Sequence, residues 1–528
     1  MVHSTQWQIG KKEVSSKHGL VACQSPKAAR AGADVLARGG NAVDAAVAAA
    51  ATLSVVEPWL SGLGGGGFMV YMGADGRDIR VLDFNMVSPA KLNPADYPLR
   101  DGDDGDWFSW PKVEGEKNLL GYSSIGVPGA VAGLGEALRT LGSISWSDAL
   151  EAAQKEAEAG LEVDWFLALA LAIDADKLAL FPGSRELYLR DGRAPRVADN
   201  PNTLRLPMDA KAAMLRRLRE AGPEDFYTGG IARKLVADMA AGGSTLDLDD
   251  LAAFRPEWLE PMRGSYRGWN LAVVPGLSAG PSLLRAMRTL ETEQMGREPS
   301  AKSALAYARA IRASYEERLK TMGHAGIAPG MDSSPSGVDA GCTSNLCVVD
   351  ARGTMVALTN TLLSRFGSKV VAPSLGLCMN NAMMWFDPRP GQPNSIAPAA
   401  RPLANMCPML LWREGGPRYA MGAAGGRTIF PTLVQIASYV ADMGFSLEQA
   451  FTTPRIDAAS PTIKVNVRAG DEAFAAVTSE FAAVRVEDAV YPVYFSVPTA
   501  VSRDAGGVNT GMAHHNSPWA AVEEGKQP

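Results

Sequence analysis

The sequence has 528 residues, of which 46% are hydrophobic and 20% are charged, and its formal net charge is −6. This is an ordinary globular composition with enough apolar residues for a large core. The negative net charge and the absence of any basic tract argue against nucleic acid as a partner.

The sequence contains five cysteines and five histidines, and their number and spacing limit which disulfides and metal sites are possible. The cysteines are odd in number and irregular in spacing, so we do not expect a disulfide framework. The histidines form no HExxH motif and no Cys/His ligand set, so we expect neither a metal nor another cofactor. His514 and His515 lie close to the end of the chain, and we expect them at the surface.

The N-terminal region carries no recognisable targeting segment. Residues 1–19 are polar, contain lysines and include no apolar stretch of the kind found in signal peptides. The longest apolar runs, Ala45–Val56 and Phe166–Ile173, are shorter than the roughly 20 residues that span a bilayer. We therefore expect both runs to be buried helices of a cytoplasmic protein without membrane contact.

The first half of the sequence alternates between predicted helices and strands. A helix over Ser25–Arg38 ends at a Gly-Gly pair, and Asn41 can cap the helix that follows. The glycine-rich turn Ser61–Gly67 leads into a strand over Phe68–Met72. The same rules predict further elements. They are strands over Val81–Phe84 and Leu271–Val274, and helices over Pro128–Leu138, Asp209–Glu220, Ile231–Ala241 and Ala304–Lys320.

The composition changes at Gly323–Gly341, which is rich in Gly, Ser, Pro and Asp and predicts an exposed, mobile linker. Two β-prone segments follow, Leu346–Val349 and Thr354–Thr361, joined by a turn, and together they predict a β-hairpin. A mobile linker thus leads directly into a strand, and Thr343 lies at the junction.

The chemistry available to Thr343 depends on whether the chain is cut before it. A threonine hydroxyl is a weak nucleophile and needs a nearby base. A threonine at a chain terminus carries its own base, because a free α-amine has a pKa of about 7.7–8.0. Taken alone, Thr343 is better explained as a β-prone residue at the start of a strand.

Two other features favour the catalytic interpretation. Gly425 and Gly426 lie between an apolar strand, Tyr419–Met421, and a helix-like run, where their backbone N–H groups could stabilise an oxyanion. Thr359 and Thr361 alternate on the second hairpin strand and so face the same side. One of them could hydrogen-bond the hydroxyl of Thr343.

The sequence resembles the γ-glutamyltransferases, or γ-glutamyl transpeptidases, and their acylase-like relatives over nearly its whole length. In the first half the matching motifs are Gly39–Ala46 (GGNAVDAA), Gly62–Phe68 (GLGGGGF), Val127–Val131 (VPGAV) and Gly222–Tyr227 (GPEDFY). In the second half they are Thr343 before Val348–Asp350, Leu358–Thr361 (LTNT), Phe366–Gly367, Asn380–Asn381, Arg401–Leu403, Gly425–Gly426 and Pro454–Arg455.

This resemblance implies an α/β fold, the αββα sandwich of the N-terminal nucleophile hydrolases. It also implies one precursor that cuts itself into two associated subunits, residues 1–342 and 343–528. By motif, Thr343 resembles the nucleophile, Thr361 its hydrogen-bonding helper, and Gly425 and Gly426 the oxyanion hole. A homodimer of the two-fragment unit is compatible with the sequence.

The sequence departs from the family where the transpeptidases hold the α-carboxylate and α-amine of the γ-glutamyl group. The family's arginine in an Asp-Phe-Arg motif is replaced here by Asn85. The other departures are Leu363, Trp385, Ala404 and Asn405. Because these changes remove the charged partners of an amino acid head, we expect poor binding of a γ-glutamyl group. The stretch Asn380–Arg401 is more similar to the cephalosporin acylase branch.

The resulting hypothesis is an amide hydrolase acting on a small-molecule amide with a non-glutamyl acyl group. One alternative is a genuine γ-glutamyl hydrolase or transferase, and another is a family member kept as a binding protein. Arg365 and Arg427 lie close in sequence to the expected catalytic elements. Either could bind an anionic acyl group beside Trp385, or both could pair with surface carboxylates.

Overall fold

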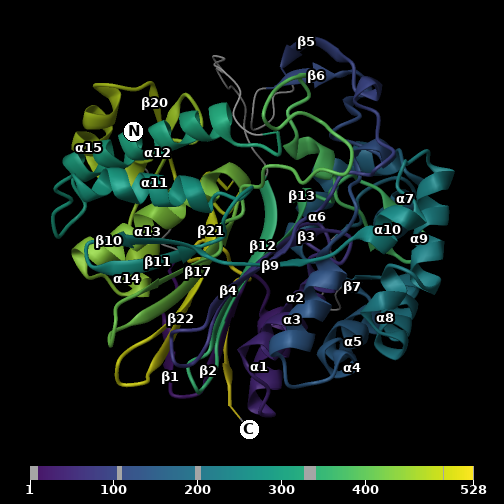
Figure 1. Cartoon of the computed structure of the whole chain (residues 1–528), viewed down its shortest axis with the longest axis horizontal. Coiled ribbons are helices and arrows are strands. Elements are labelled where there is room, and N and C mark those ends of the chain that lie inside the picture. Colours follow the sequence, from purple (N-terminus) through teal and green to yellow (C-terminus); the bar gives the residue numbers. More distant parts are fainter. Residues whose placement is uncertain (1–9, 104–109, 197–203, 326–340, 492, 527–528) are drawn as a thin grey trace.

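The computed structural model describes residues 10–103, 110–196, 204–325, 341–491 and 493–526. Within these ranges two seven-stranded sheets pack face to face, and helices cover both outer faces (Figure 1). The expected αββα sandwich is therefore confirmed.

Each sheet combines strands from both sides of the Cys342–Thr343 bond, with all neighbouring strands antiparallel. The first sheet runs in the order β1 (Val14–Ser16), β22 (Asn509–Ala513), β21 (Val497–Arg503), β17 (Arg418–Ala424), β16 (Met409–Trp412), β11 (Trp269–Val273), β10 (Met262–Tyr266). The second runs in the order β23 (Ala521–Gly525), β2 (Gly19–Cys23), β12 (Gly341–Val349), β13 (Met355–Ser364), β3 (Gly66–Met72), β4 (Ile79–Phe84), β9 (Glu257–Leu259). A cut before Thr343 would leave two fragments interleaved in both sheets.

Two groups of helices cover the sandwich. The second sheet is covered by α1 (Pro26–Ala37), α2 (Ala42–Val56) and α3 (Ala130–Leu141). Beyond them lie α4 (Trp146–Ala149), α5 (Glu151–Ala159), α6 (Trp165–Ala179), α7 (Pro182–Tyr188), α8 (Asp209–Ala221), α9 (Gly230–Ala241) and α10 (Leu248–Ala253). The first sheet is covered by α11 (Gly280–Glu291), α12 (Ala301–Thr321), α13 (Ile429–Met443), α14 (Leu447–Thr452) and α15 (Gly470–Thr478).

Short strand pairs and triplets complete the described elements. They are β5 (Leu99–Asp103) with β6 (Pro111–Val113), β7 (Leu161–Glu162) with β8 (Arg205–Leu206), β14 (Val371–Ala372) with β15 (Leu377–Cys378), and β18 (Ile456–Asp457), β19 (Ile463–Asn466) and β20 (Ala483–Val486).

Helix α2 begins where its sequence predicts, and it is buried along almost its whole length. The side chain of Asn41 accepts hydrogen bonds from the backbone N–H groups of Val43 and Asp44, and the Asp44 carboxylate accepts one from the Asn41 N–H. This capping box confirms the predicted N-cap. The alanine-rich helix is buried from Ala42 to Val55 and packs against α1 and the β12–β13 hairpin. Its C-cap, Glu57, is consequently buried too.

The predicted hairpin is confirmed, and its pairing is irregular at the proposed cleavage point. Cys342 pairs with Leu363 and Ser344 pairs with Asn360, so Thr361 and Leu362 together oppose Thr343. Such a bulge bends a strand and redirects side chains, and bulges are common beside active sites. Leu363 has a φ of 83°, a conformation that is strained for a side chain of this kind.

Two other expectations concern the predicted linker and the apolar run Phe166–Ile173. Most of the predicted linker, residues 326–340, lies outside the described residues, while the N–H of Ala325 donates to the Pro393 carbonyl at 2.9 Å. The run Phe166–Ile173 lies in a helix, α6, as expected, but the expectation of burial is wrong at Ile173, which is 43% exposed. This face of α6 borders a cavity rather than the core. Among the described residues, no helix combines the length and apolarity that crossing a membrane requires.

The glycine-rich turn before β3 brings the backbone very close to the hairpin. A Cβ on Gly65 would lie 2.0 Å from the carbonyl oxygen of Thr361, whereas a Cβ on Gly62 would have no neighbour nearer than 3.8 Å. Only glycine therefore fits at position 65, and the turn fixes the strand that carries Thr361.

We predict that Gly65→Ala lowers the apparent unfolding temperature, because β13 must move away from the added methyl group at a cost of about 1–3 kcal/mol. Gly62→Ala is the matched control and should unfold within a degree or two of the wild type. Differential scanning calorimetry of both variants makes the comparison. Equal shifts for the two substitutions would contradict the proposed close approach.

Candidate active site

Thr343 is buried in β12 and belongs to a short chain of hydrogen bonds. Its hydroxyl donates to the hydroxyl of Thr361 at 3.2 Å, and the Thr361 hydroxyl donates to the carbonyl oxygen of Cys342 at 2.6 Å. The backbone N–H of Leu363 donates to the same Thr361 oxygen at 2.9 Å. Thr361 thus contacts both the hydroxyl of Thr343 and the carbonyl of the bond that precedes it.

The other threonine of the hairpin has a different partner. Thr359 hydrogen-bonds the side-chain amide of Asn345 at 2.6 Å, and the same amide bonds the hydroxyl of Thr499 at 2.6 Å. Of the two threonines that could bond Thr343, the structure therefore selects Thr361. The bulge accounts for this choice, since it places Thr361 opposite Thr343.

Gly425 and Gly426 form the turn between β17 and α13, with φ angles of 136° and 53°. Both angles lie in the region that favours glycine. The helical turn Gly426–Thr428 contacts β12, and Gly425 lines the same cavity as Thr343. A Cβ on Gly425 would lie 2.8 Å from the Ser496 hydroxyl. The turn therefore presents backbone, not a side chain, to the wall of this cavity.

The cavity at Thr343 has a volume of about 350 Å³ and mostly apolar walls. Helix α6 contributes Phe166, Leu169 and Ile173, residues 489–491 and 493–495 contribute valine, tyrosine and phenylalanine side chains, and Trp519 lies beside Phe166. A concave, largely apolar site with a few polar groups suits a small organic molecule. Sequence analysis missed these walls, because their residues come from distant segments without a local motif.

Arg365 is the predicted binding residue that the structure brings into this cavity together with Thr343. Its guanidinium pairs with the carboxylate of Asp174, which also lies 3.5 Å from the Lys369 ammonium. All three side chains are at most 11% exposed. Asp174 projects from α6 and is not the surface carboxylate we considered. Two cations share one carboxylate here, which leaves a net positive charge beside the cavity.

His514 and His515 are buried, so the expectation that they lie at the surface is wrong. The chain crosses here from β22 in the first sheet to β23 in the second, and this crossing carries both rings into the interior. Burial lowers the pKa of His515 to about 4 and that of His514 well below its usual value. His514 lines the cavity at Thr343 as a neutral ring.

The remaining candidate positions lie outside the cavity lining. Leu363, Trp385 and Ala404 belong to the apolar cluster between the two sheets. Asn85 and Asn405 are also buried, and each has one side-chain amide atom without a partner among the described residues. These five matched positions therefore carry no charge and are not open to the cavity.

Arg427 does not reach the cavity, so its proposed role there is wrong. Its Nη2 donates to the Ala459 carbonyl at 2.6 Å, and its guanidinium lies 5.5 Å from the centre of the Tyr315 ring. The turn after Gly426 directs the side chain toward α12 instead. The described residues contain no group of three or more His, Cys, Asp or Glu side chains placed to hold a metal ion.

Comparison with known proteins adds the evolutionary context. The family model for gamma-glutamyltranspeptidase matches residues 28–335 and 328–517. An acylase ACY 1 proenzyme from Pseudomonas sp. (strain SE83) is 32% identical over 474 residues, covering 84% of this chain and 83% of the relative. A glutathione hydrolase proenzyme from Escherichia coli (strain K12) is 30% identical over 485 residues, covering 84% and 81%.

The fold is also similar to that of a solved structure. The crystal structure of cephalosporin acylase from Bacillus halodurans superimposes with a TM-score of 0.85 at 23% identity, covering 99% of both chains. Two findings indicate the same family. The family model matches most of the sequence, and the two relatives are 32% and 30% identical, each covering 84% of this chain. The chain belongs to the gamma-glutamyltranspeptidase family of enzymes.

Proposed function

We propose that this protein is a self-processing acylase that cuts itself before Thr343 and then hydrolyses small amides through an acyl-enzyme on Thr343. The observation that carries the proposal is the hydrogen-bond chain from Thr343 through Thr361 to the Cys342 carbonyl. It places a hydroxyl nucleophile and a polarised carbonyl side by side at a strained bulge.

Self-cleavage follows from this arrangement. The Thr343 hydroxyl oxygen attacks the Cys342 carbonyl carbon while Thr361 donates a hydrogen bond to the carbonyl oxygen. The C–N bond breaks, the hydroxyl proton passes to the nitrogen, and an ester joins Cys342 to the side chain of Thr343. Water then opens the ester, giving a carboxylate on Cys342 and restoring the hydroxyl of Thr343, whose α-amine was freed when the C–N bond broke.

The α-amine is the base for substrate turnover. It takes the hydroxyl proton as the Thr343 oxygen attacks the substrate carbonyl, and it returns a proton to the departing amine. Gly425 and Gly426 provide the backbone wall beside the developing oxyanion. Water admitted through the same cavity hydrolyses the acyl-enzyme and restores the free hydroxyl.

The acyl group is one without the charged head of a γ-glutamyl group. Glutathione hydrolysis, the alternative that the hydrolase relatives suggest, requires partners for an α-carboxylate and an α-amine. At the matched positions this chain has uncharged, buried residues, three of which lie between its sheets. The apolar walls at Thr343 and the positive charge of Arg365 and Lys369 instead suit an aliphatic chain, including one that ends in a carboxylate.

The role of Thr361 is tested by removing only its hydroxyl. Thr361→Val loses the hydrogen bond to the Cys342 carbonyl, and we expect self-cleavage to slow by about 10²-fold. Thr361→Ser keeps the hydroxyl and should process at a rate within a few-fold of the wild type. Cleavage is followed over time on a denaturing gel. Equal rates for the two variants would show that the hydroxyl is not used.

Three anilide substrates and one variant test the acyl specificity. We expect kcat/KM for a glutaryl anilide to exceed that for a γ-glutamyl anilide by at least about tenfold, or roughly 1.4 kcal/mol. Arg365→Ala should reduce turnover of the glutaryl substrate by about 10–100-fold, the loss expected for one charged hydrogen bond. A neutral hexanoyl anilide should be nearly unaffected.

Arg365→Lys is the control, because it keeps the positive charge next to Asp174. Tenfold faster turnover of the γ-glutamyl anilide would overturn the assigned acyl class. Equal losses of the Arg365→Ala variant on the glutaryl and hexanoyl substrates, with self-cleavage intact, would assign Arg365 a structural role.

A further inference from the structure

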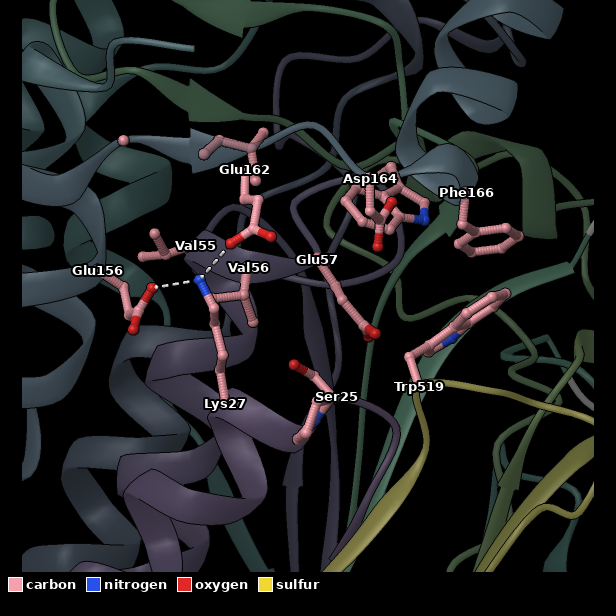
Figure 2. Close-up of a pocket in the computed structure, with 14 residues that line it drawn as sticks. Ser25, Lys27, Val55, Val56, Glu57, Glu156, Glu162, Asp164, Phe166 and Trp519 are labelled. Atoms are coloured by element: carbon pink, nitrogen blue, oxygen red, sulfur yellow. Dashed lines mark hydrogen bonds and ion pairs between the residues drawn. The ribbon is translucent and has the colours of Figure 1, made fainter. Parts of the chain in front are cut away.

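A second cavity, of about 160 Å³, shares part of its lining with the one at Thr343. Figure 2 shows the residues that line this second cavity. It is bounded by the start of α1, the end of α2, α5, the start of α6 and the segment after β22. The two cavities share Trp59, Phe166 and Trp519. The mechanism proposed above makes no use of this second space.

The inner end of the second cavity holds a buried carboxyl group that lacks a cation. Glu57 is 3% exposed, and its Oε2 has no hydrogen-bond partner among the described residues. The hydroxyl of Ser344, the residue after Thr343, hydrogen-bonds this carboxyl group. Figure 2 shows the carboxyl pointing into the space between Ser25, Asp164 and Trp519. A buried carboxyl aimed into a cavity is costly unless a ligand satisfies it.

The positive charge nearest to this end is already engaged. The Lys27 ammonium lies 3.1 Å from Glu156 and 3.1 Å from Glu162, and these bonds hold it at the outer end of the cavity (Figure 2). Glu162 is also 3.2 Å from Arg205. Glu57 and Asp164 therefore remain as two carboxyl groups without an ion pair in the described part of the chain.

Aromatic rings form the wall next to these carboxyl groups. Phe166 and Trp519 stack with their ring centres 4.1 Å apart, and Trp59 meets Phe166 edge-on at 5.9 Å. The faces of aromatic rings attract organic cations. We propose that the second cavity binds a small primary ammonium ion, held by the carboxyl groups of Glu57 and Asp164 against the rings of Trp59, Phe166 and Trp519.

The protonation of Glu57 gives this site a measurable signature. Burial, with a further contribution from Asp164, raises the pKa of Glu57 to about 8, although the Ser344 hydroxyl opposes the shift. The position at the C-terminal end of α2 disfavours a negative charge as well. Asp164 on α6 also has a raised pKa because of burial, and the nearby Cys23 thiol stays neutral, with its pKa raised to about 12.

Glu57 is therefore mostly protonated at neutral pH while the cavity holds no cation. An ammonium ion favours the carboxylate and lowers its pKa, so binding at pH 7 releases a proton. The affinity should consequently rise by up to about tenfold per pH unit below pH 8 and level off above it. Asp164, Glu156, Glu162 and Lys27 face the same cavity and set its remaining charge.

Isothermal titration calorimetry with methylammonium chloride tests this site, with sodium chloride at equal ionic strength as the comparison. We expect methylammonium to bind, sodium not to bind, and buffers of different ionisation enthalpy to reveal a released proton at pH 7. Glu57→Gln should lose at least tenfold in affinity together with the pH dependence. Glu156→Gln, whose carboxylate pairs with Lys27, is the matched control and should change affinity less than about threefold.

The inference goes beyond the proposed function and is tested separately from it, because Thr343→Ala protein should bind methylammonium as the wild type does. Equal heats for sodium and methylammonium would overturn it. So would wild-type binding without proton release, a result that requires no variant to fold. Unchanged affinity in a Glu57→Gln protein with a normal unfolding temperature would also contradict it.

Discussion

The candidate site depends above all on how β12 pairs with β13. A regular register would place one residue opposite Thr343, but the bulge places both Thr361 and Leu362 there. The extra residue turns the Thr361 hydroxyl toward the Cys342 carbonyl and strains the backbone at Leu363. The glycine-rich turn before β3 holds β13 in this position, since its backbone passes too close for any side chain at Gly65.

Burial determines the chemistry around this pairing. The hydroxyl of Thr343 hydrogen-bonds Thr361 rather than His514, which also lines the cavity, and we propose that a free α-amine on Thr343 accepts its proton. The charges that are present occur in groups that contain both signs, such as Arg365 and Lys369 around Asp174. Glu57 is the exception, because it forms no ion pair among the described residues and its carboxyl group lies beside Ser344, the residue after the nucleophile.

The sequence predicted the local elements well because their signals are local. The capping box at Asn41, the glycine turn and the β12–β13 hairpin each depend on residues close together in the chain. The ordered motifs predicted the family and the fold. The cavity walls could not be predicted in this way, because α6, residues 489–491 and 493–495, and Trp519 meet only after the sheets have assembled.

The predictions that were wrong have a similar cause, because they too depend on how distant segments come together. His514 and His515 looked like surface residues near a chain end, yet the crossing between the two sheets buries them. Arg427 lies next to Gly426 in sequence, but the turn sends its side chain to Tyr315. Sequence proximity to a catalytic element does not fix the direction in which a side chain points.

The central claim is that the chain breaks between Cys342 and Thr343 by the action of Thr343. Intact-mass analysis with N-terminal sequencing of the purified protein tests it most directly. The account predicts two fragments, the second beginning with Thr343, and a single uncut chain of 55.8 kDa for Thr343→Ala. A new N-terminus at another residue, or equal cleavage of the Thr343→Ala variant, would contradict it.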